Sequence, residues 1–302
     1  MDLRFVFTRV GGKPKPTLIN RSINNMKKYY FLLATVFFFA CSQKISLKTA
    51  QSNNLKQVEN TVFALIPEKQ LPKDSLPAER LKIELSDRTL FANWVSAGDK
   101  ANAFFILHGN GETLSDWRPL QAYLFSKGYS SFVFDYTGFG SSTGKPTVDN
   151  LNQDAVEAYK RFANLTNNAK ERIAFAHSLG CSILLETANK YSPRPSKIVT
   201  HAGFSTLIEV GMASKMITDS SKRYFPDVWN GYKNIKKLKV PLYIIHSASD
   251  KTIPISMGEA LAKSGGEKVR ILRLEKTGHN AVYLDPTDKM WLQILSFISD
   301  KN

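Results

Sequence analysis

The stretch Ala176-His177-Ser178-Leu179-Gly180 decides how this 302-residue chain is read. It follows an apolar run at 173–175 and leads into residues 182–188, whose composition favours a helix. A serine with small residues two positions before and after it fits a sharp turn from strand to helix. The serine backbone in such a turn is strained by roughly 1–3 kcal/mol. Taken alone, the pattern is equally compatible with a plain strand–helix loop.

Two later segments supply partners for a reactive serine at this turn. One β-rich apolar run leads into a loop that contains Asp250, and the next such run leads into a loop that contains His279. The chain order serine, acid, histidine is that of a catalytic triad on a parallel sheet. We therefore expect His279 to take the proton of Ser178, and Asp250 to orient the imidazole. Asp135 also ends an apolar run, but it precedes the serine, so we assign it a structural role.

A third loop offers backbone donors for a developing negative charge. The apolar run 103–107 ends in His108-Gly109-Asn110-Gly111, where glycine lets the backbone turn its N–H groups inward. We expect the oxyanion hole to consist of the Leu179 N–H and the Asn110 N–H, with the Gly111 N–H as the neighbouring alternative. Each such donor is worth about 2.7–4 kcal/mol in a transition state.

Histidine and cysteine do not follow a metal-binding pattern in this sequence. The five histidines all lie at or just after apolar runs: His108, His177, His201, His246 and His279. None has the spacing of an H-x-E-x-H type site, so we expect no metal and no cofactor. We expect His201 to line a pocket, and three of the others to hold loop backbone. Cys181 follows the turn and is expected to pack as a small apolar residue in the helix.

Together these segments resemble the α/β-hydrolase superfamily, and within it the Bem46-like, ABHD13/ABHD17-type group of serine hydrolases. The matching residues are His108-Gly109-Asn110, residues 134–144, the turn around Ser178, residues 239–254 with Asp250, and Gly278-His279. The resemblance covers roughly residues 78–300. The chain departs from the group at Ala176, where glycine is usual, and at Thr137, where arginine is frequent.

The resemblance implies a serine hydrolase that cleaves carboxylic or acyl esters through an acyl-enzyme intermediate. Relatives that remove palmitoyl groups imply an acyl-protein or acyl-CoA thioesterase as an alternative. A serine peptidase is a further alternative, although no separate motif marks one. The non-enzymatic alternative is a ligand-binding module on a hydrolase scaffold, and the full set of candidate residues argues against it.

Alternating apolar runs and helical segments place the chain in the α/β class, with a mostly parallel, doubly wound sheet and helices on both faces. Residues 81–85 and 90–95 predict an antiparallel N-terminal edge. We expect a single hydrolase domain over residues 61–302. An aromatic- and methionine-rich insertion at about 204–236 predicts a short helical cap. Its large side chains either accommodate an acyl or aryl group or simply pack the cap onto the body.

The N-terminal region predicts a targeting signal rather than a folded element. Residues 26–41 have a basic start, a short apolar run and a lipobox-like end at Cys41. The apolar run is shorter than the roughly 20 residues of a membrane span. We expect a lipidated Cys41, with ordinary cleavage or an uncleaved anchor as alternatives. Residues 1–25 are interpreted as a non-native or disordered extension, and 42–60 as a flexible tether.

These features predict a lipoprotein anchored to a membrane of the bacterial cell envelope and facing the periplasm, with a secreted or signal-anchored protein as the alternative. The net charge of +15 does not indicate a nucleic-acid partner, because seven of the Lys and Arg residues lie in residues 1–40. The basic run 233–239 is either a solvated helix face or a surface attracted to anionic lipid headgroups. The expected partners are a small acyl ester and the membrane that holds the lipid anchor.

Overall fold

The computed structural model describes residues 47–60, 62–63, 66–67, 69 and 75–299. Its contacts divide the chain into two units, residues 1–51 and 52–302. The first unit is helical over its described residues, 47–51. The predicted extension 1–25, signal segment 26–41 and lipidation site Cys41 lie outside the described residues.

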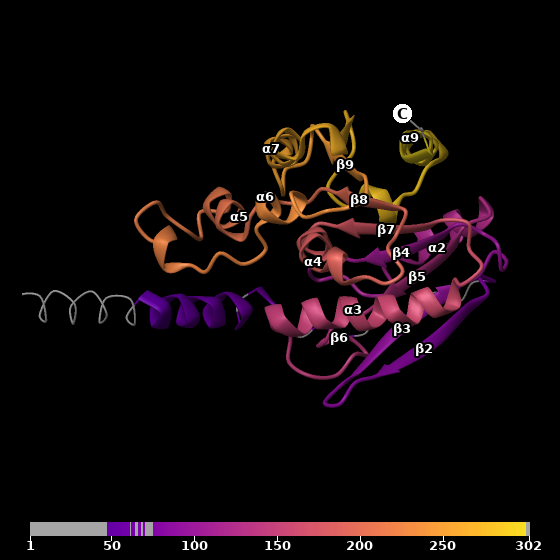
Figure 1. Cartoon of the computed structure of the whole chain (residues 1–302), viewed down its shortest axis with the longest axis horizontal. Helices are drawn as coiled ribbons and strands as arrows, with labels where there is room; N and C mark the ends of the chain where they lie inside the picture. Colours follow the sequence, from indigo (N-terminus) through magenta and orange to yellow (C-terminus); the bar gives the residue numbers. More distant parts are fainter. Residues whose placement is uncertain (1–46, 61, 64–65, 68, 70–74, 300–302) are drawn as a thin grey trace, which may run out of the picture. The chain divides into compact units, whose positions relative to one another are not determined.

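The second unit is built on an eight-stranded sheet with the strand order β10-β9-β8-β7-β4-β5-β3-β2 (Figure 1). The strands are β2 (Ala78–Glu84), β3 (Thr89–Val95), β4 (Ala103–Leu107), β5 (Ser130–Phe134), β7 (Arg172–His177), β8 (Lys197–His201), β9 (Leu242–Ser247) and β10 (Val269–Leu274). The pairs from β5 through β10 are parallel, whereas β3 pairs antiparallel with both β2 and β5. The mostly parallel sheet and its antiparallel N-terminal edge are therefore as predicted. A short pair, β1 (Ile66–Pro67) with β6 (Phe139–Gly140), lies apart from this sheet.

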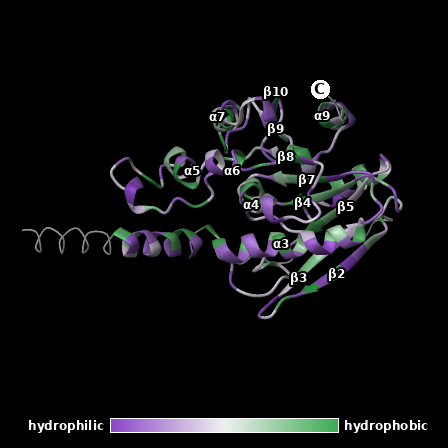
Figure 2. Ribbon diagram, viewed as in Figure 1, coloured by the Kyte–Doolittle hydropathy of each residue, from purple (hydrophilic) through white to green (hydrophobic). Residues whose placement is uncertain are grey.

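Both faces of the sheet are covered, which explains why its central strands are continuously apolar. All five residues of β4 are buried, and they alternate between two separate cores. Phe105 packs into the core on one face, while Phe104 and Ile106 pack into the core on the other. Figure 2 shows the resulting hydrophobic strands at the centre of the domain.

Helices supply the outer layers of this two-faced arrangement. One core contains side chains of α3, α4, α6 and α7, and the other contains side chains of α2, α8 and α9. The helices are α2 (Arg118–Ser126), α3 (Val148–Leu165), α4 (Leu179–Thr187), α5 (Leu207–Ala213), α6 (Gly231–Ile235), α7 (Ile255–Gly265), α8 (Ala281–Leu284) and α9 (Asp288–Ser299), with short 3₁₀ turns at 188–190, 222–224 and 266–268. The start of α3 is fixed by the Thr147 side chain, which accepts a hydrogen bond from the Asn150 N–H.

The segment that precedes the sheet differs from its prediction. Residues 52–60, assigned above to a flexible tether, are helical and bonded to the body of the domain. The Glu59 carboxylate accepts the Val148 N–H at 2.9 Å, and the Asn54 side chain donates to the Tyr224 carbonyl at 3.0 Å. These bonds order the segment, and its polar composition alone did not indicate them.

The predicted cap region, 204–236, contains α5, a 3₁₀ turn and α6. Trp229 is buried against Phe63, with ring centroids 5.9 Å apart, and its indole N–H donates to the Asn152 side chain. Tyr232 donates to the Glu209 carboxylate, a bond within the cap. Met216 is 63% exposed. Trp229 therefore packs the region onto the body, in agreement with the second of the two roles considered above.

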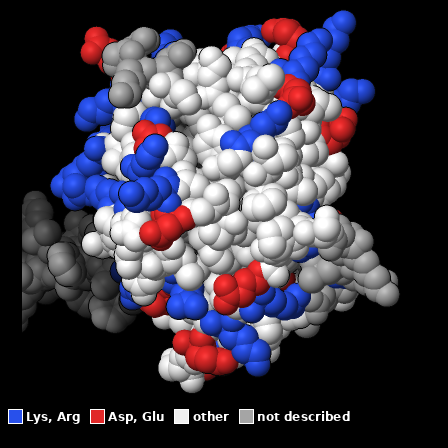
Figure 3. Space-filling model, turned by 90° about the vertical axis from the view of Figure 1, so that its right-hand side faces the viewer, with Lys and Arg blue, Asp and Glu red and all other residues white. Residues whose placement is uncertain are grey.

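The surface carries charges of both signs. On the face shown in Figure 3, Lys and Arg side chains are interspersed with Asp and Glu around a largely uncharged centre. Within the described residues, no helix is both long and apolar enough to cross a membrane.

Candidate active site

The serine of the decisive stretch lies on a strained turn between β7 and α4. Ser178 has φ 49° and ψ −116°, a left-handed conformation that L-residues rarely adopt. A Cβ atom added to Gly180 would lie 2.4 Å from the Leu107 carbonyl oxygen, so only glycine fits there. Ala176, two residues before the serine, is fully buried and its methyl group is accommodated. The close crossing of α4 over β4 is the physical reason for the small residue at position 180.

The structure brings Ser178, His279 and Asp250 into one hydrogen-bonded line. The His279 Nε2 atom lies 3.1 Å from the Ser178 Oγ atom, and His279 Nδ1 lies 2.7 Å from the Asp250 Oδ2 atom. The three residues follow β7, β10 and β9, whose carboxyl ends share one edge of the sheet. A base within hydrogen-bond reach of a hydroxyl, itself oriented by a carboxylate, is the geometry that activates a nucleophile.

The Asp250 carboxylate is fully buried and held in its ionised form. Burial by itself opposes ionisation, but the nearby His246 ring and the hydrogen bond with His279 outweigh it and hold the pKa of Asp250 well below its usual range. Its Oδ1 atom also accepts the N–H groups of Thr252 and Ile253, at 2.8 and 3.0 Å. A carboxylate fixed by several donors presents one orientation to the imidazole.

The predicted oxyanion donors lie on two loops that flank the serine. Leu179 is the first residue of α4, and Asn110 lies in the loop after β4. Among the described residues, neither backbone N–H has a hydrogen-bond partner, as expected of groups that await an acceptor. The Asn110 side chain donates to the Val62 carbonyl at 3.0 Å, which attaches the loop to the N-terminal segment.

The remaining polar residues singled out from the sequence serve mostly to hold backbone. The Asp135 carboxylate accepts the Leu114 N–H at 2.9 Å, in keeping with a structural role. His246 Nε2 lies 2.9 Å from the Ile253 carbonyl oxygen. His201, which the sequence analysis assigned to the pocket lining, is instead 1% exposed and lies beside His177. Cys181 is buried, and burial raises the pKa of its thiol.

Sequence reasoning missed Glu112, a carboxylate directly behind the Asn110 loop. It is 7% exposed and accepts the Gly109 N–H at 2.7 Å. Its position immediately after His108-Gly109-Asn110-Gly111 was the available signal, because an acidic residue there can bond back to the loop backbone.

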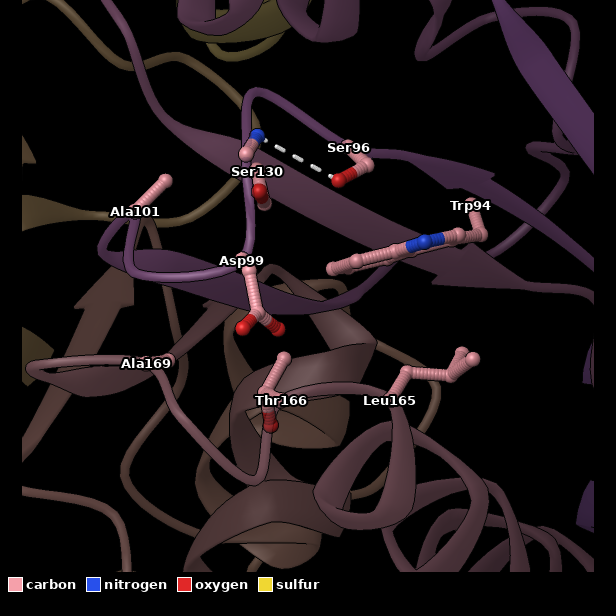
Figure 4. A pocket seen from close by; sticks show the side chains of 9 residues that line it. Trp94, Ser96, Asp99, Ala101, Ser130, Leu165, Thr166 and Ala169 are labelled. Atoms are coloured by element: carbon pink, nitrogen blue, oxygen red, sulfur yellow. Dashed lines mark hydrogen bonds between the residues drawn. The ribbon is translucent and has the colours of Figure 1, made fainter.

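The hollow drawn in Figure 4 lies at the other end of the sheet. Its volume is about 150 Å³, and its walls include Trp94 of β3 together with Asp99, Leu165 and Thr166, which precede the amino ends of β4 and β7. It is thus separate from Ser178. Within the described part of the chain, no group of three His, Cys, Asp or Glu side chains is arranged to hold a metal ion.

Comparison with known proteins agrees with this architecture. Residues 102–234 match the family model of the alpha/beta hydrolase fold. The human alpha/beta hydrolase domain-containing protein 17B is 29% identical over 179 residues, covering 59% of this chain and 60% of that protein. The protein YfhR of Escherichia coli is 26% identical over 224 residues, covering 70% of this chain and 77% of YfhR.

Solved structures share the fold at low sequence identity. The Pyrococcus furiosus esterase Pf2001 superposes with a TM-score of 0.60 at 17% identity, covering 76% of this chain and 94% of the esterase. The Thermogutta terrifontis esterase Est2 gives a TM-score of 0.57 at 16% identity, with 76% and 98% coverage. The chain therefore has the alpha/beta hydrolase fold. Its similarity to protein 17B is consistent with the Bem46-like group named above.

Proposed function

We propose that this chain is a serine hydrolase that cleaves carboxylic or acyl esters through an acyl-enzyme intermediate. The observation that carries the proposal is the line Ser178 Oγ, His279 Nε2, His279 Nδ1 and Asp250 Oδ2, with separations of 3.1 and 2.7 Å. The strained backbone of Ser178 adds support, because strain of this kind persists where the surrounding structure enforces it for function.

In the proposed reaction the Ser178 Oγ atom attacks the carbonyl carbon of the ester while its proton moves to His279 Nε2. The N–H groups of Leu179 and Asn110 stabilise the oxyanion of the tetrahedral intermediate. His279 then gives the proton to the leaving alcohol as the C–O bond breaks. A water molecule, deprotonated by His279, attacks the acyl carbon; the bond to Ser178 Oγ then breaks, His279 returns the proton to Oγ, and the acid is released.

Asp250 keeps its negative charge throughout this cycle, since its hydrogen bonds hold its pKa far below neutral pH. It fixes the tautomer that leaves His279 Nε2 free to accept a proton, and it stabilises the imidazolium that forms. None of these steps requires a metal or an organic cofactor.

Labelling with a fluorophosphonate probe tests the proposal directly. The full chain is compared with Ser178→Ala and with Ser182→Ala, a matched control whose hydroxyl is buried in α4. We expect wild type and Ser182→Ala to be labelled and Ser178→Ala to remain unlabelled. A folded wild type that neither reacts with the probe nor hydrolyses any acyl ester would favour the ligand-binding module instead.

Ester and thioester substrates distinguish an esterase from a thioesterase. A panel of p-nitrophenyl esters and acyl-CoA thioesters of matched chain length gives the ratio of kcat/KM values for the two classes. An ester preference supports the proposal as stated, and a thioester preference supports the acyl-protein or acyl-CoA thioesterase. Cleavage of amide substrates alone would indicate the peptidase.

We also propose that the chain is carried to the cell envelope and lipidated at Cys41. Support comes from the sequence pattern of residues 26–41 alone. Metabolic labelling with an alkyne fatty acid is expected to mark the wild type and to leave Cys41→Ser unmarked, while Cys181→Ser keeps the label. Labelling of Cys41→Ser at the wild-type level would refute lipidation at this residue.

A further inference from the structure

Glu112 is a buried carboxylate that the proposed mechanism does not use. Its Oε2 atom accepts the Gly109 N–H at 2.7 Å and the Trp117 indole N–H at 2.9 Å, and its Oε1 atom lies 3.3 Å from His177 Nε2. Burial opposes ionisation, but the interactions with His177 and the Gly109 N–H outweigh it and lower the pKa of Glu112 to about 2. A fully bonded anion therefore lies directly behind the Asn110 loop.

His177 connects this anion to the other two loops of the site. It immediately precedes Ser178, and its ring centroid lies 4.8 Å from that of His279. Its Nε2 atom also lies 3.4 Å from the Asn280 Oδ1 atom, on the residue that follows His279. Glu112 and His177 thus touch all three segments that carry reacting groups.

The hydrogen-bond partners determine where the protons of this cluster lie. His177 Nδ1 and His201 Nδ1 are 3.0 Å apart, so one of them donates and the other accepts. Burial and the neighbouring histidines keep the pKa of His201 well below its usual value, so this ring is neutral. Its Nε2 atom is buried and has no partner among the described residues, which favours the proton on Nδ1. His177 therefore accepts at Nδ1 and donates from Nε2 to Glu112.

We propose that Glu112 and His177 are positioning residues for the hydrolytic reaction, which lock the Asn110 loop to the Ser178 turn and the His279 loop. This inference rests on the proposed function. It goes beyond that function because it assigns the preorganisation of the oxyanion donors to a specific buried pair outside the triad.

Glu112 can position the Asn110 loop because it holds the His108–Gly109 peptide tightly. A Cβ atom on Gly109 would lie only 2.5 Å from Glu112 Oε1, so the carboxylate is packed directly against this backbone. The bond to the Gly109 N–H fixes the rotation of the His108–Gly109 peptide, which directly precedes the peptide that carries the Asn110 N–H. A misplacement of about 1 Å at such a donor reduces a rate by about 100-fold.

The replacement Glu112→Gln tests the pair with little change in volume. With its oxygen in the place of Oε2, the amide still accepts the N–H groups of Gly109 and Trp117, but its NH₂ group then faces the N–H of His177. We expect kcat for a p-nitrophenyl ester to fall by about 10–100-fold with KM within about twofold. The matched control is Asp154→Asn, a buried carboxylate paired with Arg88 and bonded to the Thr137 N–H, for which kcat stays within about twofold.

Nitrogen-15 NMR of the histidine rings gives a readout that a merely structural role would not move. We expect His177 to carry a proton on Nε2 in wild type and to change its pattern of ring protons in Glu112→Gln. Glu112→Asp, which keeps the charge but is one methylene shorter, provides a second variant and should also lose kcat selectively. An Nδ1-protonated His177 in wild type would overturn the inference.

The outcomes for the pair and for the hydrolase are distinguishable. Wild-type kcat in folded Glu112→Gln or Glu112→Asp, while Ser178→Ala is inactive, overturns the positioning role and leaves the proposed function intact. A wild type without ester hydrolysis or probe labelling overturns the proposed function. If neither Glu112 variant folds, the wild-type tautomer measurement decides the inference.

Discussion

At Gly180, the addition of a single methyl group should disrupt the tight turn between β7 and α4. The added Cβ of Gly180→Ala would lie 2.4 Å from the Leu107 carbonyl oxygen and 2.7 Å from that of His108, whereas ordinary contact begins at 3.4 Å. Both neighbours are backbone atoms of β4 and its loop, so no side-chain rotation relieves the overlap. Either α4 or the β4 loop must move by about 1 Å.

Overpacking of this kind typically costs about 1–3 kcal/mol of unfolding free energy. For a domain of this size that corresponds to a fall in Tm of about 2–12 °C. Because the displaced loop carries Asn110, and α4 carries the Leu179 N–H, we also expect kcat to fall by about 100-fold. Thermal unfolding and ester hydrolysis by the same preparation measure the two effects.

Ser182→Ala on the same helix is the control, since the Ser182 hydroxyl is buried without a partner among the described residues. It should match wild type in both assays. If Gly180→Ala retained the wild-type Tm and kcat, the inference that a tight α4–β4 crossing positions the oxyanion donors would be refuted.

Further predictions concern the buried charges. Asp250→Asn leaves His279 without a fixed tautomer and should lower kcat by about 10⁴-fold with little change in KM, as measured by steady-state kinetics. Because the pKa of Glu112 is lowered from 4.5 to about 2, its charge contributes about 3 kcal/mol of stability above pH 4.5, and this is lost as pH falls toward 2. Urea titrations should show a steeper loss over that range in wild type than in Glu112→Gln; equal slopes would contradict this. Arg88→Met removes the ion-pair partner of the fully buried Asp154 and should lower the unfolding free energy by about 3–5 kcal/mol in urea titrations. Asp87→Ala removes the exposed carboxylate that also pairs with Arg88 and should have little effect.

Some secondary-structure elements could be predicted from the sequence alone, and others could not. The apolar run at 103–107 coincides with the bounds of β4, because a continuous apolar run between polar turns is the signature of a buried parallel strand. The helix at 52–60 was missed, since its polar residues suited a tether equally well. Its order depends on bonds such as that from Val148 to Glu59, across 89 positions of the chain.

Some residues of the candidate site could also be predicted from the sequence, and others could not. Local sequence determined the turn at Ser178, because the size of the residues at 176 and 180 limits how closely strand and helix can cross. Chain order along parallel strands was enough to select Asp250 and His279, since the carboxyl ends of those strands meet at one edge. No local rule, however, distinguishes a histidine that lines a pocket from one buried behind it, and His201 was misassigned for that reason.

Only the tertiary structure decided which polar groups meet in the interior. Glu112 and His177 are 65 positions apart, and neither stands out in composition or periodicity. Their pairing depends on the parallel placement of β4 beside β7, and so does the ionised state of the carboxylate. Sequence determined the elements and the order of the reactive residues because those follow from local sterics and periodicity. Burial, proton placement and the coupling between loops depend on contacts that exist only once the sheet is assembled.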